Sequence, residues 1–211
     1  MPVNDDQLVV RTIRHAPIEL GKQQIIAGRL DPPLNDEGEE MISALKTTVP
    51  VPEFDILVTS PLRRAHDTAR QLTGIADADI TVTPLCAERN YGQLEGVPAD
   101  TIGDIEPQTF YVSIGGIDYS LNPPDGETLE ELRLRAASFH EFMETFHGQC
   151  VLVVSHEAFL QQYNGLLRGL DVYHSLTSHV TYLEINEFRL AGNKLVSHEL
   201  IHRPEAIYES W

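Results

Sequence analysis

The sequence predicts an α/β fold, a three-layer α/β/α sandwich around a mostly parallel sheet. Short apolar runs of strand length alternate with amphipathic helical stretches, as in successive βαβ units. Polar residues suited to chemistry follow two of these runs, where parallel strands end together at one edge of a sheet. With 211 residues, 42% of them hydrophobic, we expect a single domain over residues 1–211.

The first half of the chain is predicted to contain three strands and two helices. Residues 7–13 form a short apolar run of the kind that is buried in a sheet. Asn35 precedes several acids and then apolar residues, which indicates a helix N-terminus, and Gly74 marks the end of a second helix. The other expected elements are strands at residues 54–59 and 80–82 and the second helix at residues 62–72.

The second half contains a long amphipathic helix, a buried strand and a segment of a different character. Residues 96–126 are rich in Pro, Gly and Asp without a sustained period, so we expect a loop-rich insertion that covers the active site. Apolar residues at helical spacing predict a helix over residues 127–146. The remaining expected elements are a strand at 151–154, a helix at 158–167, and strands at 180–185 and 195–201 joined through Gly192.

Composition excludes several classes of function. The chain has 15 Lys and Arg against 32 Asp and Glu, a formal charge of -17, which repels nucleic acid and anionic membranes at long range. No apolar run is long enough to cross a bilayer and the N-terminus lacks a leader pattern, so a cytoplasmic location is expected. Cys86 and Cys150 lack metal-type spacing and are expected to be reduced, buried thiols. Any anionic substrate must therefore be captured by local arginines.

Two histidines and an arginine pair are the candidates for chemistry. Arg14 and His15 follow the first strand directly, and His156 follows a later strand and precedes a helix. Both histidines are therefore expected at the same carboxyl edge of the sheet. Arg63 and Arg64 lie at the start of a helix, where planar guanidinium groups and free helix amides suit a phosphate.

Motifs in matching order over nearly the whole chain resemble those of the histidine phosphatase superfamily, also called phosphoglycerate mutase-like, in its phosphatase branch. The motifs are Arg14-His15, residues 28–35 (GRLDPPLN), 60–65 (SPLRRA), 88–96 (ERNYGQLEG) and 154–156 (VSH).

The resemblance implies a metal-independent phosphomonoester hydrolase that uses neither metal nor cofactor. By position, His15 corresponds to the nucleophile, Arg14 and Arg64 to the phosphate clamps, His156 to the electrostatic partner, and Glu88 to the proton donor. A neutral imidazole nitrogen can attack phosphorus, and the phosphohistidine is then hydrolysed by water. The arginines and His156 would supply the positive charge or hydrogen bonds that a metal supplies elsewhere.

Three positions depart from the family pattern. Ala16 and Glu157 replace the glycines that follow the two histidines, and Gly21 stands where an asparagine commonly contacts phosphate. We expect the backbone amide of Glu157 to bind phosphate and its side chain to point away, at the start of a helix. The candidates for substrate binding are Gly21, Lys22, Arg29, Arg89, Tyr91 and Tyr111.

Two alternatives to a phosphatase remain open: a phosphoglycerate mutase-type phosphotransferase and an inactive module that binds a phospho-ligand. Residues 90–132 lack any Lys or Arg and carry several acids and aromatic residues, which disfavours a second phosphate. The expected partner is therefore a small phosphate ester with a neutral or cationic remainder. No clustered motif supports a metallohydrolase, and a homodimer is one of the oligomeric states left open.

Overall fold

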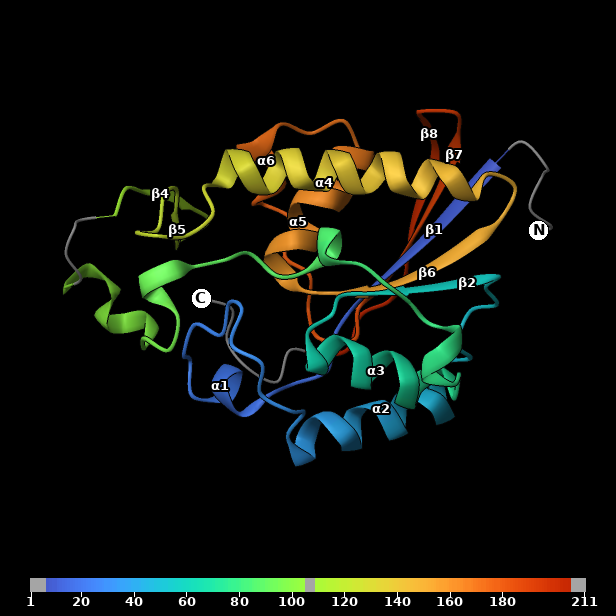
Figure 1. The fold of residues 1–211 in the computed structure, drawn as a ribbon, viewed down its shortest axis with the longest axis horizontal. Coiled ribbons are helices and arrows are strands. Elements are labelled where there is room, and N and C mark those ends of the chain that lie inside the picture. Colours follow the sequence, from blue (N-terminus) through green and yellow to red (C-terminus); the bar gives the residue numbers. More distant parts are fainter. Residues whose placement is uncertain (1–6, 105–108, 206–211) are drawn as a thin grey trace.

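A computed structural model describes residues 7–104 and 109–205 of the chain. Its centre is a six-stranded sheet in the order β3-β2-β6-β1-β7-β8, covered by helices on both faces (Figure 1). The first four strands in this order run parallel, β7 runs antiparallel to β1, and β8 runs antiparallel to β7. The three-layer, mostly parallel α/β prediction is therefore confirmed. The strands are β1 (Gln7–Arg14), β2 (Ile56–Thr59), β3 (Thr81–Val82), β6 (Cys150–Ser155), β7 (Ile185–Ala191) and β8 (Lys194–His202).

The central strands of the sheet are buried from both sides, which explains the uninterrupted apolar runs in the sequence, whereas the edge strand β8 is mostly exposed. Every residue of β6 is buried, since this strand lies between β2 and β1. Two apolar clusters fill the layers. One packs helices α4 and α5 against one face of the sheet, and the other packs α2 and α3 against the opposite face (Figure 1).

The helices begin and end close to the positions that the sequence predicts. Asn35 caps α2 by accepting a hydrogen bond from the amide of Gly38, and Gly74 ends α3 in the left-handed conformation with φ of 73°. Thr128 and Glu131 form a reciprocal capping box at the start of α4. The α-helices are α1 (Glu19–Lys22), α2 (Asp36–Thr48), α3 (Arg63–Thr73), α4 (Leu129–Met143), α5 (Glu157–Leu167) and α6 (Val172–Ser175), and the 3-10 helices are η1 (Asp77–Asp79), η2 (Pro84–Cys86), η3 (Gly92–Leu94), η4 (Ala99–Asp104) and η5 (Glu144–Phe146).

The prediction of a strand at residues 180–185 is wrong. The chain forms a turn there, and the strand begins only at Ile185. Leu183 has a φ of 57°, which a strand cannot contain, and its amide donates to the backbone oxygen of Arg14. The segment before β7 is therefore folded over the end of β1, where it places Tyr182 beside His15.

The insertion at 96–126 covers one end of the sheet, as expected, but it is more ordered than its composition predicts. It contains a two-stranded antiparallel hairpin of β4 (Tyr111–Ile114) and β5 (Ile117–Ser120), together with the helix η4. Arg89 fixes this hairpin, because its guanidinium donates to the backbone oxygens of Ser120, Leu121 and Glu127. Residues 105–108 of the insertion, like the N-terminal residues 1–6 in which no leader was expected, lie outside the described residues.

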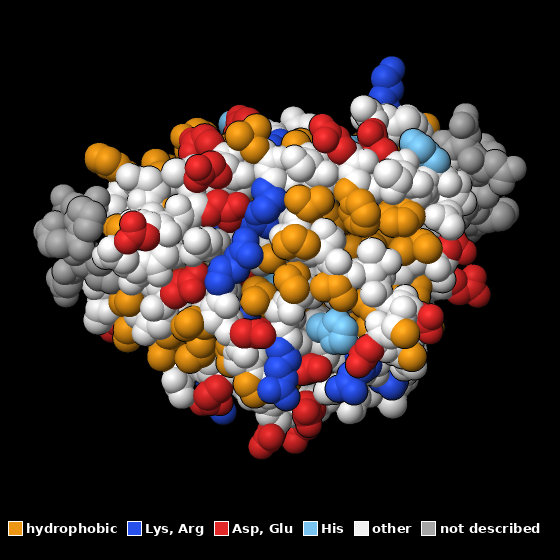
Figure 2. Space-filling model, in the orientation of Figure 1, with side chains coloured by type: hydrophobic (Ala, Val, Ile, Leu, Met, Phe, Trp, Pro, Cys, Tyr) orange, Lys and Arg blue, Asp and Glu red, His pale blue; other side chains and the backbone are white. Residues whose placement is uncertain are grey.

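The distribution of charged side chains on the surface and the state of the two cysteines agree with what the composition predicts. On the face drawn in Figure 2, acidic side chains lie at many separate places while basic ones gather in a few small groups. Cys86 and Cys150 are buried, free cysteines. In the described part of the chain, no helix is long and apolar enough to cross a membrane.

The packing of α4 against α5 supplies a test of the fold. Phe139 is fully buried, with its ring 5.3 Å from Phe159 and 4.9 Å from Tyr163. We predict that Phe139→Ala lowers the free energy of unfolding by about 3–5 kcal/mol, because it leaves a cavity and removes both edge-to-face contacts. Leu134→Ala in the same helix, where Leu134 is 68% exposed, should change the free energy by less than about 0.5 kcal/mol. Urea titrations of the three proteins measure both values, and equal losses would contradict the core assignment.

Candidate active site

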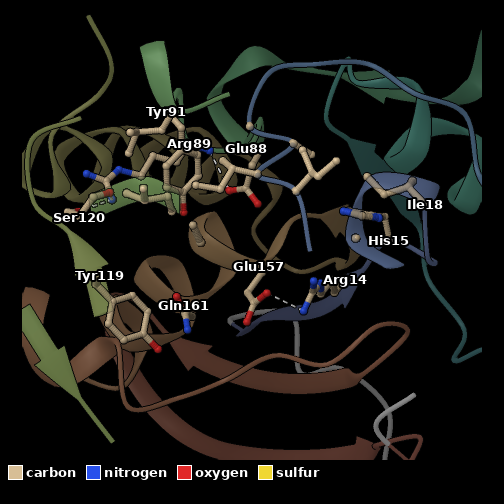
Figure 3. Close-up of a pocket in the computed structure, with 18 of the residues that line it drawn as sticks. Arg14, His15, Ile18, Glu88, Arg89, Tyr91, Tyr119, Ser120, Glu157 and Gln161 are labelled. Carbon is tan, nitrogen blue, oxygen red and sulfur yellow. Dashed lines mark hydrogen bonds and ion pairs between the residues drawn. The ribbon is translucent and has the colours of Figure 1, made fainter. Parts of the chain in front are cut away.

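A cavity of about 160 Å³ opens between the carboxyl edge of the sheet and the insertion (Figure 3). It brings together residues that are far apart in the sequence, from the ends of β1 and η2 and from the starts of α3 and α5. Of the five residues expected to carry chemistry, four line this cavity: Arg14, His15, Arg64 and Glu88. His156 lies directly behind, with its ring 5.0 Å from the ring of His15.

The hydrogen bonds of His15 determine which ring nitrogen is free to react. Nδ1 lies 2.7 Å from the backbone oxygen of Ala16, and a carbonyl can only accept, so Nδ1 carries the proton. Nε2 therefore holds the lone pair, and it accepts from Nε of Arg64 at 3.1 Å. Burial, followed by the charges of Arg64 and Arg14, lowers the pKa of His15 well below its ordinary value. The imidazole is thus neutral at pH 7, and its Nε2 lone pair accepts from Arg64, which lines the cavity beside it.

Arg64 is held in one position by the segment that resembles the family motif at residues 28–35. Its Nη2 donates to the oxygen of Gly28 and its Nη1 to the oxygen of Leu30, both at 2.7 Å. The side chain is 1% exposed and lies in the first turn of α3. A guanidinium fixed in this way presents its charge to an anion at His15 without losing side-chain entropy on binding.

Arg14 forms the second cationic side of the cavity. Its Nη1 contacts the oxygen of Val180 at 2.8 Å and the carboxylate of Glu157 at 2.7 Å, while its guanidinium lies 3.9 Å from the ring of Tyr182. Burial alone would lower the pKa of Arg14, but Glu157, Tyr182 and Glu88 together outweigh burial and raise it. Nε has no hydrogen-bond partner among the described residues, so Arg14 keeps a donor for a ligand.

His156 is a buried imidazole whose hydrogen-bonding capacity is unused. The residue is fully buried, and neither ring nitrogen has a partner within the described part of the chain. Burial, and then the charge of Arg64, lowers its pKa well below the ordinary value. A buried polar group without a partner is costly, which points to a ligand that completes its hydrogen bonds.

Glu88 is a carboxyl group that is suited to hold a proton. It is 8% exposed, and burial raises its pKa although the amide of Arg89, at 2.7 Å from Oε1, and the charge of Arg64 act in the opposite direction. The amide of Phe159 lies 3.3 Å from the same oxygen and fixes the carboxyl group against α5. The raised pKa lets Glu88 keep its proton at higher pH than an ordinary carboxyl group, which is what a general acid needs.

Glu157 contradicts the expectation that its side chain points away from the site. The carboxylate turns into the cavity and pairs with Arg14, as the dashed line in Figure 3 shows. The reason is that the buried guanidinium of Arg14 needs a counter-ion, and the first residue of α5 lies beside it. Burial would raise the pKa of Glu157, but Arg14 and then His179 outweigh burial and lower it.

The candidates for substrate binding divide into two groups. Gly21, Arg89, Tyr91 and Tyr111 line the cavity, whereas Lys22 and Arg29 do not. At Gly21 a Cβ atom would lie 2.3 Å from the hydroxyl of Tyr182, so the glycine makes room for that ring.

Sequence reasoning missed Gln161, Tyr182 and His179. Gln161 and Tyr182 line the cavity, and His179 lies 3.7 Å from the carboxylate of Glu157. No local pattern in the sequence could have identified them, because each reaches the cavity only through the fold.

Among the described residues, no three His, Cys, Asp or Glu side chains gather closely enough to hold a metal ion. The cations that line the cavity are Arg14, Arg64 and Arg89. The arrangement suits an anion next to a neutral imidazole nucleophile, with a buried carboxyl on the opposite side.

These features define an α/β protein with a buried histidine between two arginines at its sheet edge. The chain belongs to the histidine phosphatase superfamily (branch 1), whose family model matches residues 11–201. It is 30% identical over 167 residues to a 2,3-bisphosphoglycerate-dependent phosphoglycerate mutase of Bartonella henselae, covering 75% of this chain and 81% of the mutase. It is also 31% identical over 147 residues to an uncharacterized phosphatase of Bacillus subtilis, covering 69% and 70% of the two chains. Among solved structures, the alpha-ribazole phosphatase of Shigella flexneri has a similar fold, with a TM-score of 0.80 at 20% identity over 96% of this chain and 99% of that one.

The lowered pKa of His15 predicts how stability depends on pH. In the folded protein His15 stays neutral below pH 6.5, whereas the unfolded chain binds a proton there, so the unfolded state binds more protons. The free energy of unfolding should therefore decrease as pH falls below about 6.5. Because one proton is involved, the decrease is at most about 1.4 kcal/mol per pH unit. His15→Asn should make this decrease shallower in urea titrations between pH 5 and 7. The same exchange at the exposed His147 is the control, and an unchanged slope in His15→Asn would contradict the assignment.

Proposed function

We propose that this protein is a metal-independent phosphomonoester hydrolase that acts through a phosphohistidine on His15. The observation that carries the proposal is the tautomer of His15, which lines the cavity and whose Nε2 lone pair accepts from the fixed guanidinium of Arg64. A fixed, neutral nitrogen nucleophile beside anion-binding groups is what phosphoryl transfer through histidine needs.

In the first half-reaction, Nε2 of His15 forms a bond to phosphorus and the bond from phosphorus to the ester oxygen breaks. Glu88 gives its proton to the departing alkoxide, which leaves as an alcohol. Arg14, Arg64 and a donor nitrogen of His156 bind the oxygens of the transferring group, whose charge is spread over them.

In the second half-reaction, water attacks the phosphohistidine. The carboxylate of Glu88 takes a proton from the water, the bond from phosphorus to Nε2 breaks, and inorganic phosphate leaves with His15 restored. The raised pKa of Glu88 suits both steps, because the group must change its protonation state between them.

A mutase-type phosphotransferase is the second candidate, and the identity with the Bartonella henselae mutase supports it. A bisphosphorylated intermediate requires cations for a second phosphate. Arg89 is the lining cation outside the pair that flanks His15, and its guanidinium is already bound to the oxygens of Ser120, Leu121 and Glu127. This favours hydrolysis of a monophosphate over a mutase reaction.

Substitution of His15 tests the proposal directly. His15→Ala should abolish turnover of aryl and alkyl phosphates, because no other nitrogen takes the place of Nε2, and it should keep the fold seen by circular dichroism. Brief incubation with radiolabelled substrate should label the wild type with an acid-labile phosphate and leave His15→Ala unlabelled. Turnover should persist in EDTA. A labelled His15→Ala protein, or loss of activity in EDTA that zinc or manganese restores, would contradict the mechanism.

The role of Glu88 predicts a dependence on the leaving group. Glu88→Gln should lose about a hundredfold or more in kcat/KM for an alkyl phosphate but less than about tenfold for an aryl phosphate, because an aryl oxide leaves without a proton. Single-turnover phosphorylation of His15 by both esters measures the difference. Equal losses on the two substrates would assign Glu88 a positioning role instead.

A further inference from the structure

The departure from the family pattern at Glu157 places an anionic side chain inside the cavity. Its carboxylate is bonded to Arg14 through Oε2 and lies 3.7 Å from His179 through Oε1, and the side chain keeps 26% of its surface exposed. An ionised carboxylate accepts about four hydrogen bonds. Glu157 therefore has acceptor capacity left that faces the ligand space.

The charges around the cavity do not match a simple dianionic ester. Arg14 and Arg64 contribute two positive charges beside His15, and Glu157 cancels one of them, since its pKa is lowered and it is ionised at neutral pH. Arg89 and Asp118, which also line the cavity, add one positive and one negative charge that cancel. A phosphate dianion thus leaves the site with a net negative charge unless the rest of the substrate brings a positive one.

The wall next to Glu157 is built for a polar group. Gln161 is 2% exposed and lines the cavity, and its Nε2, a donor with no partner among the described residues, suits an oxygen of the substrate rather than its ammonium group. The hydroxyl of Tyr111 is also buried without a partner in the described part of the chain. Figure 3 shows Gln161 between Glu157 and Tyr119 on the same side of the cavity. Aromatic faces beside a carboxylate are the surroundings that protein sites provide for ammonium groups.

We propose that Glu157 is a specificity-determining residue that selects phosphate esters of short amino alcohols by binding their ammonium group. The proposal rests on the proposed hydrolase function and names its substrate class. Arg14 keeps a free Nε while its Nη1 holds Glu157, so one guanidinium bridges the phosphate and the carboxylate that binds the ammonium.

The spacing and size of the site limit the substrate. Because Glu157 and the phosphate both contact Arg14, charge-assisted hydrogen bonds of about 2.7–2.9 Å place the ammonium about two or three carbon atoms from the ester oxygen. A cavity of about 160 Å³ is close to the size that holds a benzene-sized ligand. A 2-aminoethyl phosphate has this length and charge.

The test compares three small esters: 2-aminoethyl phosphate, its neutral isostere propyl phosphate, and the anionic 2-phosphoglycolate. The wild type should hydrolyse the ammonium ester with kcat/KM about tenfold or more above propyl phosphate, and 2-phosphoglycolate should be the poorest substrate. Glu157→Gln should reduce this ratio to about twofold, whereas Glu157→Asp, which keeps the charge, should retain part of it. The ratio is the readout, since releasing Arg14 changes phosphate binding for all three esters alike.

Glu141→Gln removes an exposed carboxylate outside the cavity and is the matched control, with the ratio expected to stay at the wild-type value. A wild-type enzyme that hydrolyses the three esters equally, or a preference that survives in Glu157→Gln, overturns the assignment of Glu157 but leaves the hydrolase intact. The wild-type ratio decides the matter even where the variant fails to fold. Absence of turnover and of phosphohistidine with every ester overturns the hydrolase and the specificity assignment together.

Discussion

The contact between Arg64 and His15 is the interaction on which the arrangement of the site depends. Arg64 is buried with its guanidinium bound to the oxygens of Gly28 and Leu30, and its Nε points at Nε2 of His15. A buried cation is stable only with such partners, so the chain at residues 28–30 and the start of α3 must be in place before the histidine is positioned. Burial and then the charge of the same guanidinium lower the pKa of both His15 and His156. Arg64 therefore fixes the position of His15 and helps burial to keep its ring neutral.

A second buried arginine, Arg89, holds the insertion in place through hydrogen bonds to backbone oxygens. Arg89 binds three backbone oxygens at the junction of β5 and α4, while Arg135 pairs with Glu127 at 2.7 Å and donates to the oxygens of Leu85 and Ala87. These contacts anchor the insertion to the segment that carries Glu88. Glu88, the proposed general acid, and the insertion wall of the cavity are thus held by the same network.

Charge inside the cavity differs from the charge of the protein as a whole. The surface carries the acidic surplus of the sequence, and the cavity concentrates arginines at the end near His15. Glu157 changes this balance locally, because it neutralises Arg14 without leaving the ligand space. Selectivity among phosphate esters is then a matter of which remainder tolerates a carboxylate beside the phosphate.

The sequence by itself determined the α/β architecture, most strands and helices, and the set of residues at the sheet edge. Local patterns carry this information, since a strand buried on both faces is apolar throughout and its carboxyl end must be followed by a turn, as at His15 and His156. Only the tertiary structure decided the direction of the Glu157 side chain, the hairpin within the insertion and the turn at residues 180–184. Each of these depends on a partner distant in sequence: Glu157 turns toward Arg14, Arg89 holds the hairpin, and Leu183 bonds to the end of β1. The periodicity of a segment reports which face it buries, and it contains no information about the charge or carbonyl that the fold brings to it.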